Sequence, residues 1–83
     1  MAAVKLKGSE SNLASATNLG FATLVRLVNN SNSTQLVTLK NAGGTTLGTF
    51  TMTANSVELV KKTSTDTLTG AATTLACKVA STW

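Results

Sequence analysis

Residues 34–53 read TQLVTLKNAGGTTLGTFTMT, and this stretch decides the fold. Its first part alternates apolar and polar residues, so that Val37 and Leu39 point to one face. Its last part alternates in the same way, with Phe50 and Met52 pointing inward between threonines that point outward. Alternation with a period of two is typical of a β-strand with one buried face. The sequence therefore predicts two strands, one before and one after the central NAGG.

The residues between these two strands predict a tight turn. Asn41-Ala42-Gly43-Gly44 contains the residue types that tolerate the positive φ angles of turns. Gly48 interrupts the alternation of the second strand, which indicates a β-bulge. We therefore expect residues 34–53 to form an antiparallel β-hairpin.

Similar alternation extends outward to both ends of the chain. Further strands are expected at 3–7, 21–29, 56–62 and 75–81, with a short one at 66–69. Turn residues separate these runs at intervals of about 8–12 residues, as in antiparallel sandwiches and small barrels. The predicted fold is all-β, a single domain over 1–83 that forms a small antiparallel β-sandwich or barrel of roughly six to seven short strands, immunoglobulin-like or related.

The same patterns predict which side chains face the core. The residues expected to point inward are Val57, Leu59, Leu75, Cys77 and Val79, while Phe21, Val25 and Leu27 share one parity within 21–29. Leu24 and Val28 have the opposite parity within 21–29. That run is therefore either a strand covered on both faces or a strand whose phase changes at a bulge.

Residues 8–20 (GSESNLASATNLG) form a polar stretch with isolated Leu13 and Leu19. Its apolar residues are too sparse for a helix, so we expect a long loop or arm between two strands. Long loops in small domains are functional or mobile. Two interpretations stay open: a disordered surface loop, or a segment that becomes ordered on a neighbouring subunit.

Composition limits how such a small domain is stabilised. The chain has 83 residues, one cysteine and no histidine, so it has neither an intrachain disulfide nor the ligands of a structural zinc site. Domains of this size usually need such a staple. Self-association or docking onto a larger assembly remains as a source of added stability, since binding only the folded state stabilises it.

The sequence offers no constellation for catalysis. Absence of histidine removes the commonest general base and the usual serine or cysteine triads. The acidic residues Glu10, Glu58 and Asp66 lie in separate segments; we expect Glu58 to point outward and Asp66 to bond its own backbone in a turn. Cys77 is expected to be a buried, inert thiol. The prediction is a non-enzyme with no catalytic, cofactor-binding or metal-binding residues.

Charge and length restrict the partners. The net charge is +4, but the seven cations are scattered and only three residues are aromatic, so a nucleic-acid partner is disfavoured. No stretch has the length and apolarity expected of a signal peptide or a membrane span. A membrane partner is therefore not expected.

Five residues are expected to contact a protein partner. Leu13 and Leu19 would do so from the 8–20 arm, and Lys5 and Lys7 from the first strand. Trp83 would either fold back onto its own sheet or occupy a pocket of the partner, because tryptophan is frequent in interface hot spots.

The stretch from Val25 to Val79 resembles a known group of proteins. The motifs are RLVN at 26–29, LVTLK at 36–40, GGTTLGTF at 43–50, SVELVKK at 56–62 and TDTL at 65–68. They are similar to small virion structural proteins of tailed bacteriophages, particularly phages of marine bacteria. The resemblance covers about two-thirds of the chain and implies a compact β-sandwich.

This resemblance also implies a function. The leading hypothesis is a capsid decoration (cement) protein that binds the outer surface of a phage head, made in the host cytoplasm and then located in the virion. Its partners would be the major capsid protein or other virion proteins, or further copies of itself. The alternatives are a tail, neck or fibre component, and a host-surface or carbohydrate-binding module.

Overall fold

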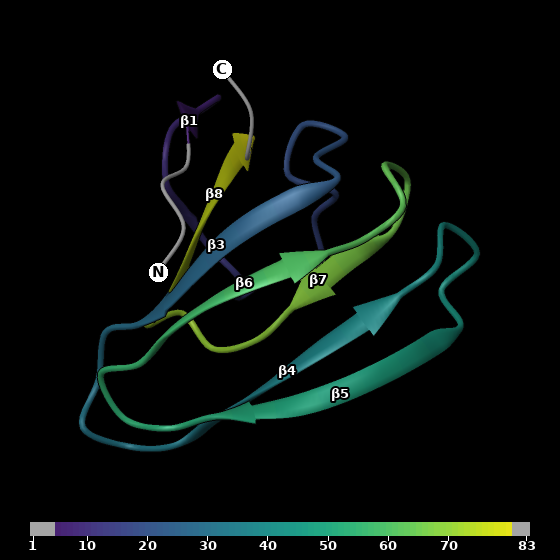
Figure 1. The fold of residues 1–83 in the computed structure, drawn as a ribbon. Coiled ribbons are helices and arrows are strands. Elements are labelled where there is room, and N and C mark those ends of the chain that lie inside the picture. Colours follow the sequence, from purple (N-terminus) through teal and green to yellow (C-terminus); the bar gives the residue numbers. More distant parts are fainter. Residues whose placement is uncertain (1–4, 81–83) are drawn as a thin grey trace.

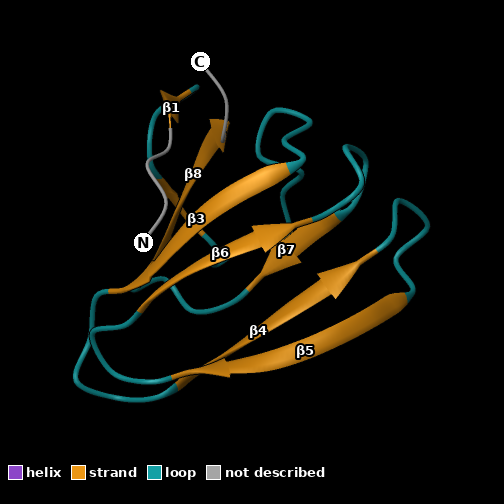
Figure 2. Cartoon of the chain, viewed as in Figure 1, coloured by secondary structure: helices purple, strands orange, loops and turns teal. Residues whose placement is uncertain are grey.

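The computed structural model describes residues 5–80, which form an all-β structure with no helix in that range (Figures 1 and 2). The strands are β1 (Lys5–Leu6), β2 (Ser11–Asn12), β3 (Leu24–Asn29), β4 (Gln35–Lys40), β5 (Thr46–Met52), β6 (Val57–Lys61), β7 (Thr67–Thr69) and β8 (Thr74–Ala80). Each strand expected from the sequence is present, and several ends differ by a few residues; residues 3–4 and 81 of the expected first and last strands lie outside the described range. The additional strand is β2, which has only two residues.

Two antiparallel sheets pack face to face (Figure 1). The first has the order β1-β8-β3-β6, with β2 also paired to β8; the second has the order β5-β4-β7. The predicted antiparallel sandwich is therefore confirmed. Its connectivity differs from that of an immunoglobulin domain, in which the last strand joins the sheet of the strand before it. Here β7 belongs to the second sheet, whereas the next strand, β8, belongs to the first and lies between β1 and β3.

The predicted hairpin is formed by β4 and β5. Val37 pairs with Phe50, and the register shifts between Leu39 and Lys40, so a bulge lies at this end of the hairpin, where Leu39 pairs with Gly48. In the turn, the Asn41 side-chain oxygen accepts hydrogen bonds from the backbone N–H groups of residues 43 and 45, at 2.9 and 3.0 Å. The local turn chemistry therefore sets the register of this pair.

The core lies between the two sheets. Its buried members are Leu13, Ala22, Val25, Leu27, Val37, Met52, Leu68 and Ala76. Leu19, Leu39, Phe50 and Val60 are partly buried against them. Within β3, Val25 and Leu27 are therefore the residues that face the core. The inward orientation predicted for the two strands of the hairpin is confirmed.

For β6 and β8, the prediction of which side chains point to the core was wrong. Leu27 pairs with Ala76, so Ala76 faces the core and Cys77, paired with Arg26, lies on the opposite face of the sheet. In β6, Val60 is the residue that packs against the core. Leu75, Val57 and Leu59 consequently share the face of Cys77. These strands carry apolar residues on both faces, and only their pairing decides which set is inside.

The 8–20 segment is not a separate arm. β2 pairs with β8, and Thr17 exchanges backbone hydrogen bonds of 3.1 and 2.9 Å with Leu68 of β7. The segment therefore crosses from one sheet to the other and closes that side of the sandwich. Leu13, placed between these two attachments, is 0% exposed. The prediction that Leu13 contacts a partner was wrong, because this leucine is part of the core.

Asn29, the last residue of β3, joins the two sheets at the end of the sandwich where β3 leads into β4. It is 0% exposed, and its Nδ2 donates to the carbonyl oxygens of Ser33, Thr53 and Met52 at 2.8, 3.0 and 3.3 Å. Its Oδ1 accepts a hydrogen bond of 2.8 Å from the Ser31 hydroxyl. One buried amide thus links the end of β3 to the loops that follow β3 and β5.

Candidate interaction surfaces

The loop before β3 has an unusual backbone. Leu19, Gly20 and Phe21 have φ angles of 58°, 68° and 59°. This left-handed region costs about 1–2 kcal/mol for a residue with a side chain. Phe21 was expected in a strand, and this expectation was wrong. The strand begins at Leu24, and the Phe21 side chain is 61% exposed.

Polar side chains next to the loop supply the hydrogen bonds that a strand would have made. Asn18 Oδ1 accepts from the backbone N–H groups of Gly20 and Phe21 at 3.1 and 3.2 Å. Thr17 Oγ1 accepts from the N–H of Leu19 at 3.1 Å. Asparagine and threonine often bond nearby backbone groups in this way and so replace regular secondary structure. The sequence TNLGF at 17–21 therefore forms a turn, and β3 starts only after it, at Leu24.

Lys62 forms hydrogen bonds with both ends of this loop. Its side chain is 8% exposed, and its Nζ donates to the carbonyl oxygens of Asn18 and Ala22 at 3.0 and 2.6 Å. Burial lowers the pKa of Lys62 by desolvation; the nearby Asp66 carboxylate opposes this shift, and Lys78 adds to it. A buried ammonium that meets only carbonyl oxygens ties the loop to the end of β6.

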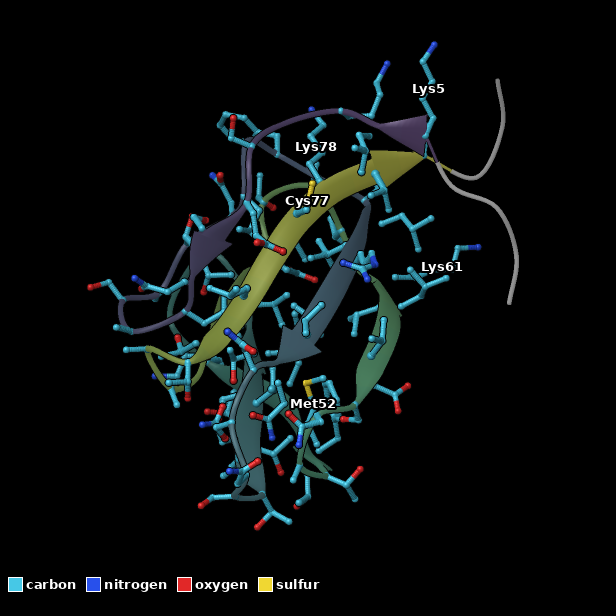
Figure 3. The ribbon with its side chains drawn as sticks, turned by 90° about the vertical axis from the view of Figure 1, so that its left-hand side faces the viewer. Lys5, Met52, Lys61, Cys77 and Lys78 are labelled. Atoms are coloured by element: carbon cyan, nitrogen blue, oxygen red, sulfur yellow. The ribbon has the colours of Figure 1, made fainter. Side chains whose placement is uncertain are left out.

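Lys78 adds a second attachment. It extends from β8, next to Cys77 (Figure 3), and its Nζ lies 2.9 Å from the carbonyl oxygen of Gly20. Lys62, directly after β6, and Lys78, in β8, therefore converge on residues 18–22. We call this segment the clamped loop.

The clamped loop lines one hollow in the surface, and the residues that directly follow it line another. One, of about 370 Å³, is lined by Leu19 and Gly20 together with Lys7, Ser9, Ser11 and Lys78. The other, of about 590 Å³, is lined by Thr23 and Leu24 together with Lys61, Lys62, Asp66 and Val79. Each hollow has two lysines among its lining residues, so the surroundings of the loop are predominantly cationic.

A second surface is the side of the first sheet that faces away from the second sheet, here called the outer face. Its side chains are Leu6, Arg26, Val28, Val57, Leu59, Lys61 and Leu75. Leu6 and Leu59 are 69% and 38% exposed. An antiparallel sheet with one face on the core normally has a polar face toward water. The outer face is instead mostly apolar, with two cations, Arg26 on β3 and Lys61 at the end of β6.

Cys77 also lies on this side of the sheet. It is 6% exposed because the segment between β1 and β2 covers it, and its Sγ lies 3.2 Å from the carbonyl oxygen of Gly8. The predicted burial of the thiol is confirmed, although the thiol lies outside the main core.

The acidic residues do not converge. Asp66 is 8% exposed and closes a turn, where its Oδ2 accepts from the N–H of Thr63 at 3.2 Å, as predicted. Glu10 and Glu58 are exposed in other strands and loops. Within residues 5–80, no group of three or more His, Cys, Asp or Glu side chains is placed to hold a metal ion. No helix in this range has the length and apolarity to span a membrane.

The residues expected to contact a partner are dispersed. Leu19 and Lys7 come together at the smaller hollow, whereas Lys5 is exposed on β1 (Figure 3). Trp83 lies outside the described residues, and Leu13 is in the core. A partner role for Lys5, Lys7, Leu19 and Trp83 stays a prediction.

No protein-family model, curated protein or solved structure matches this chain. The resemblance to phage virion proteins therefore stays a prediction from the motifs, and the interaction surfaces have to be interpreted from their own chemistry.

Proposed function

We propose that this chain is a non-enzymatic structural protein of a phage virion, a capsid decoration protein that binds the outer surface of the head and stabilises it. The observation that carries the proposal is the apolar outer face. A sandwich needs only one apolar face per sheet, and the first sheet has two. The second apolar face is explained if another protein covers it in the assembled state.

The charge of this surface specifies the partner further. Arg26 lies between Cys77 and Leu59 of the neighbouring strands, Lys61 is exposed at the edge strand, and the chain carries a net charge of +4. Complementarity favours a partner surface that is apolar with carboxylates around it. The proposed occupant is the major capsid protein, whose lattice would repeat the same contact many times, so that weak single contacts combine into stable attachment.

The small size of the core supports the same conclusion. Eight fully buried apolar side chains form the cluster, and Cys77 has no disulfide partner. A partner that binds only the folded chain stabilises it by mass action. Attachment to a capsid would therefore benefit both proteins.

Binding to heads assembled without this chain tests the proposal. Wild-type protein is expected to sediment with the heads and to appear as regular density on their outer surface by cryo-electron microscopy. Leu59→Ser should weaken binding about tenfold, because it removes one leucine from the buried contact. Leu36→Ser is the matched control, since Leu36 is 56% exposed on the second sheet. Density confined to the tail would contradict capsid placement.

A further inference from the structure

The side chain of Phe21 is 61% exposed and does not belong to the buried core cluster. It is the one aromatic among the large apolar side chains that are exposed within residues 5–80. It does not belong to the outer face, because it lies in the clamped loop before β3 begins. An exposed phenylalanine leaves a large apolar surface in water, and such side chains are typical of binding anchors.

The backbone at this position adds a second cost. A φ of 59° suits glycine or asparagine better than phenylalanine. The fold therefore holds an unfavourable residue in an unfavourable conformation without burying it. Strained residues that the surroundings enforce are concentrated at binding and catalytic sites.

The loop is also rigidly supported. Lys62 bonds the carbonyl oxygens of Asn18 and Ala22, on either side of Phe21, and Lys78 bonds that of Gly20. Asn18 additionally accepts from the N–H of Phe21 itself. A side chain presented by a loop that is already fixed loses less conformational entropy when it binds.

We propose that Phe21 is a preorganised anchor that inserts into an apolar pocket of a partner protein, and that carboxylates around this pocket enter the two hollows beside the loop. One hollow is lined by Lys7 and Lys78, and the other by Lys61 and Lys62. Among residues 5–80, Asp66 is the single carboxylate that lines either hollow, and it accepts a hydrogen bond from the Thr63 N–H. The charge beside Phe21 thus favours an acidic rim on the partner.

The identity of the partner rests on the proposed function, and the experiment separates the two claims. Phage heads assembled without the chain are titrated with wild type, Phe21→Gly and Phe21→Asn. Both substitutions suit the left-handed backbone, and asparagine avoids the added flexibility of glycine. We expect each variant to bind heads at least tenfold more weakly, since a hot-spot aromatic is lost. The melting temperature of Phe21→Gly should rise by about 4 °C as strain is removed.

Leu47→Ala provides the control, because Leu47 is 54% exposed on the second sheet; its affinity for heads should stay within about twofold of wild type. If wild type binds and both Phe21 variants bind equally well, the anchor is refuted and the proposed function stands. If Phe21→Gly lowers the melting temperature, Phe21 packs in the fold and the anchor is again refuted. A wild type that does not bind heads overturns both claims.

Discussion

Replacing Asn29 by aspartate is expected to destabilise the sandwich strongly. The two side chains have nearly the same shape, so the change leaves packing intact and exchanges the NH₂ donor for an oxygen. Nδ2 has two hydrogens and three nearby carbonyl oxygens, of which those of Ser33 and Thr53 are the closer, at 2.8 and 3.0 Å. In Asn29→Asp, both hydrogen bonds are lost and a carboxylate faces these oxygens.

The magnitude follows from these contacts. Each lost hydrogen bond costs about 1 kcal/mol net, and a buried charge set against carbonyl oxygens adds roughly 1–2 kcal/mol. The expected loss in free energy of unfolding at neutral pH is therefore about 3–4 kcal/mol. With a urea m-value of about 1 kcal/mol/M, the unfolding midpoint should fall by about 3–4 M.

Burial next to carbonyl oxygens, with the Ser31 hydroxyl as the one donor left from the Asn29 contacts, should raise the pKa of the introduced carboxyl in the folded state above its unfolded value of about 3.9. Protonation then favours the folded state, so the deficit should shrink as the pH falls through the raised pKa and become constant below about 3.9. Urea unfolding followed by far-ultraviolet circular dichroism at several pH values measures this dependence.

Asn32→Asp is the matched control. Asn32 is exposed, and its Oδ1 accepts from Asn55 Nδ2 at 3.2 Å, which a carboxylate would still do. Its stability should change by less than about 0.5 kcal/mol. Equal stability of the Asn29→Asp and Asn32→Asp variants at neutral pH would refute the assignment of Asn29 as the link between the sheets.

Two further predictions concern the clamped side of the sandwich. Leu13→Ala should cost about 2–5 kcal/mol in urea unfolding as a core truncation, whereas the exposed Leu36→Ala should cost less than about 0.5 kcal/mol; similar values for both would mean that the 8–20 segment is not packed. Burial lowers the pKa of Lys62 from 10.5, so between the lowered pKa and 10.5 the unfolded chain binds more protons than the folded chain. The stability of the wild type relative to Lys62→Met should therefore increase with pH across that window. A difference that does not depend on pH would contradict this.

The parts of the fold that were predicted depend on local information. Alternation and the Asn41–Gly44 turn specify the hairpin of 34–53 without reference to other strands. The facing of 75–81 was not predictable in this way, because Leu75 and Cys77 on one face compete with Ala76 on the other. Pairing with β3 placed Ala76 inside. The two-residue β2 gave no periodic signal, and Leu13 looked isolated because its neighbours in the core come from distant segments.

The candidate site was predicted less well than the fold. Lys7 and Leu19 were selected and do lie together at one hollow, but Phe21 was assigned to a strand. The signal that was present is TNLG at 17–20, whose threonine, asparagine and glycine favour a turn before the apolar run. An alternation that points Val57 and Leu59 inward places Lys62 on the exposed side. With Val60 inward, the same alternation places Lys62 on the buried side.

The position of β8 has a consequence for biosynthesis. This strand lies between β3 and the N-terminal strands, yet it leaves the ribosome after all the other described strands. Until it emerges, β3 has an unpaired edge and β1 and β2 have no sheet to join. The nascent chain therefore has to complete its fold after translation of β8, and truncated products would expose strand edges that invite aggregation.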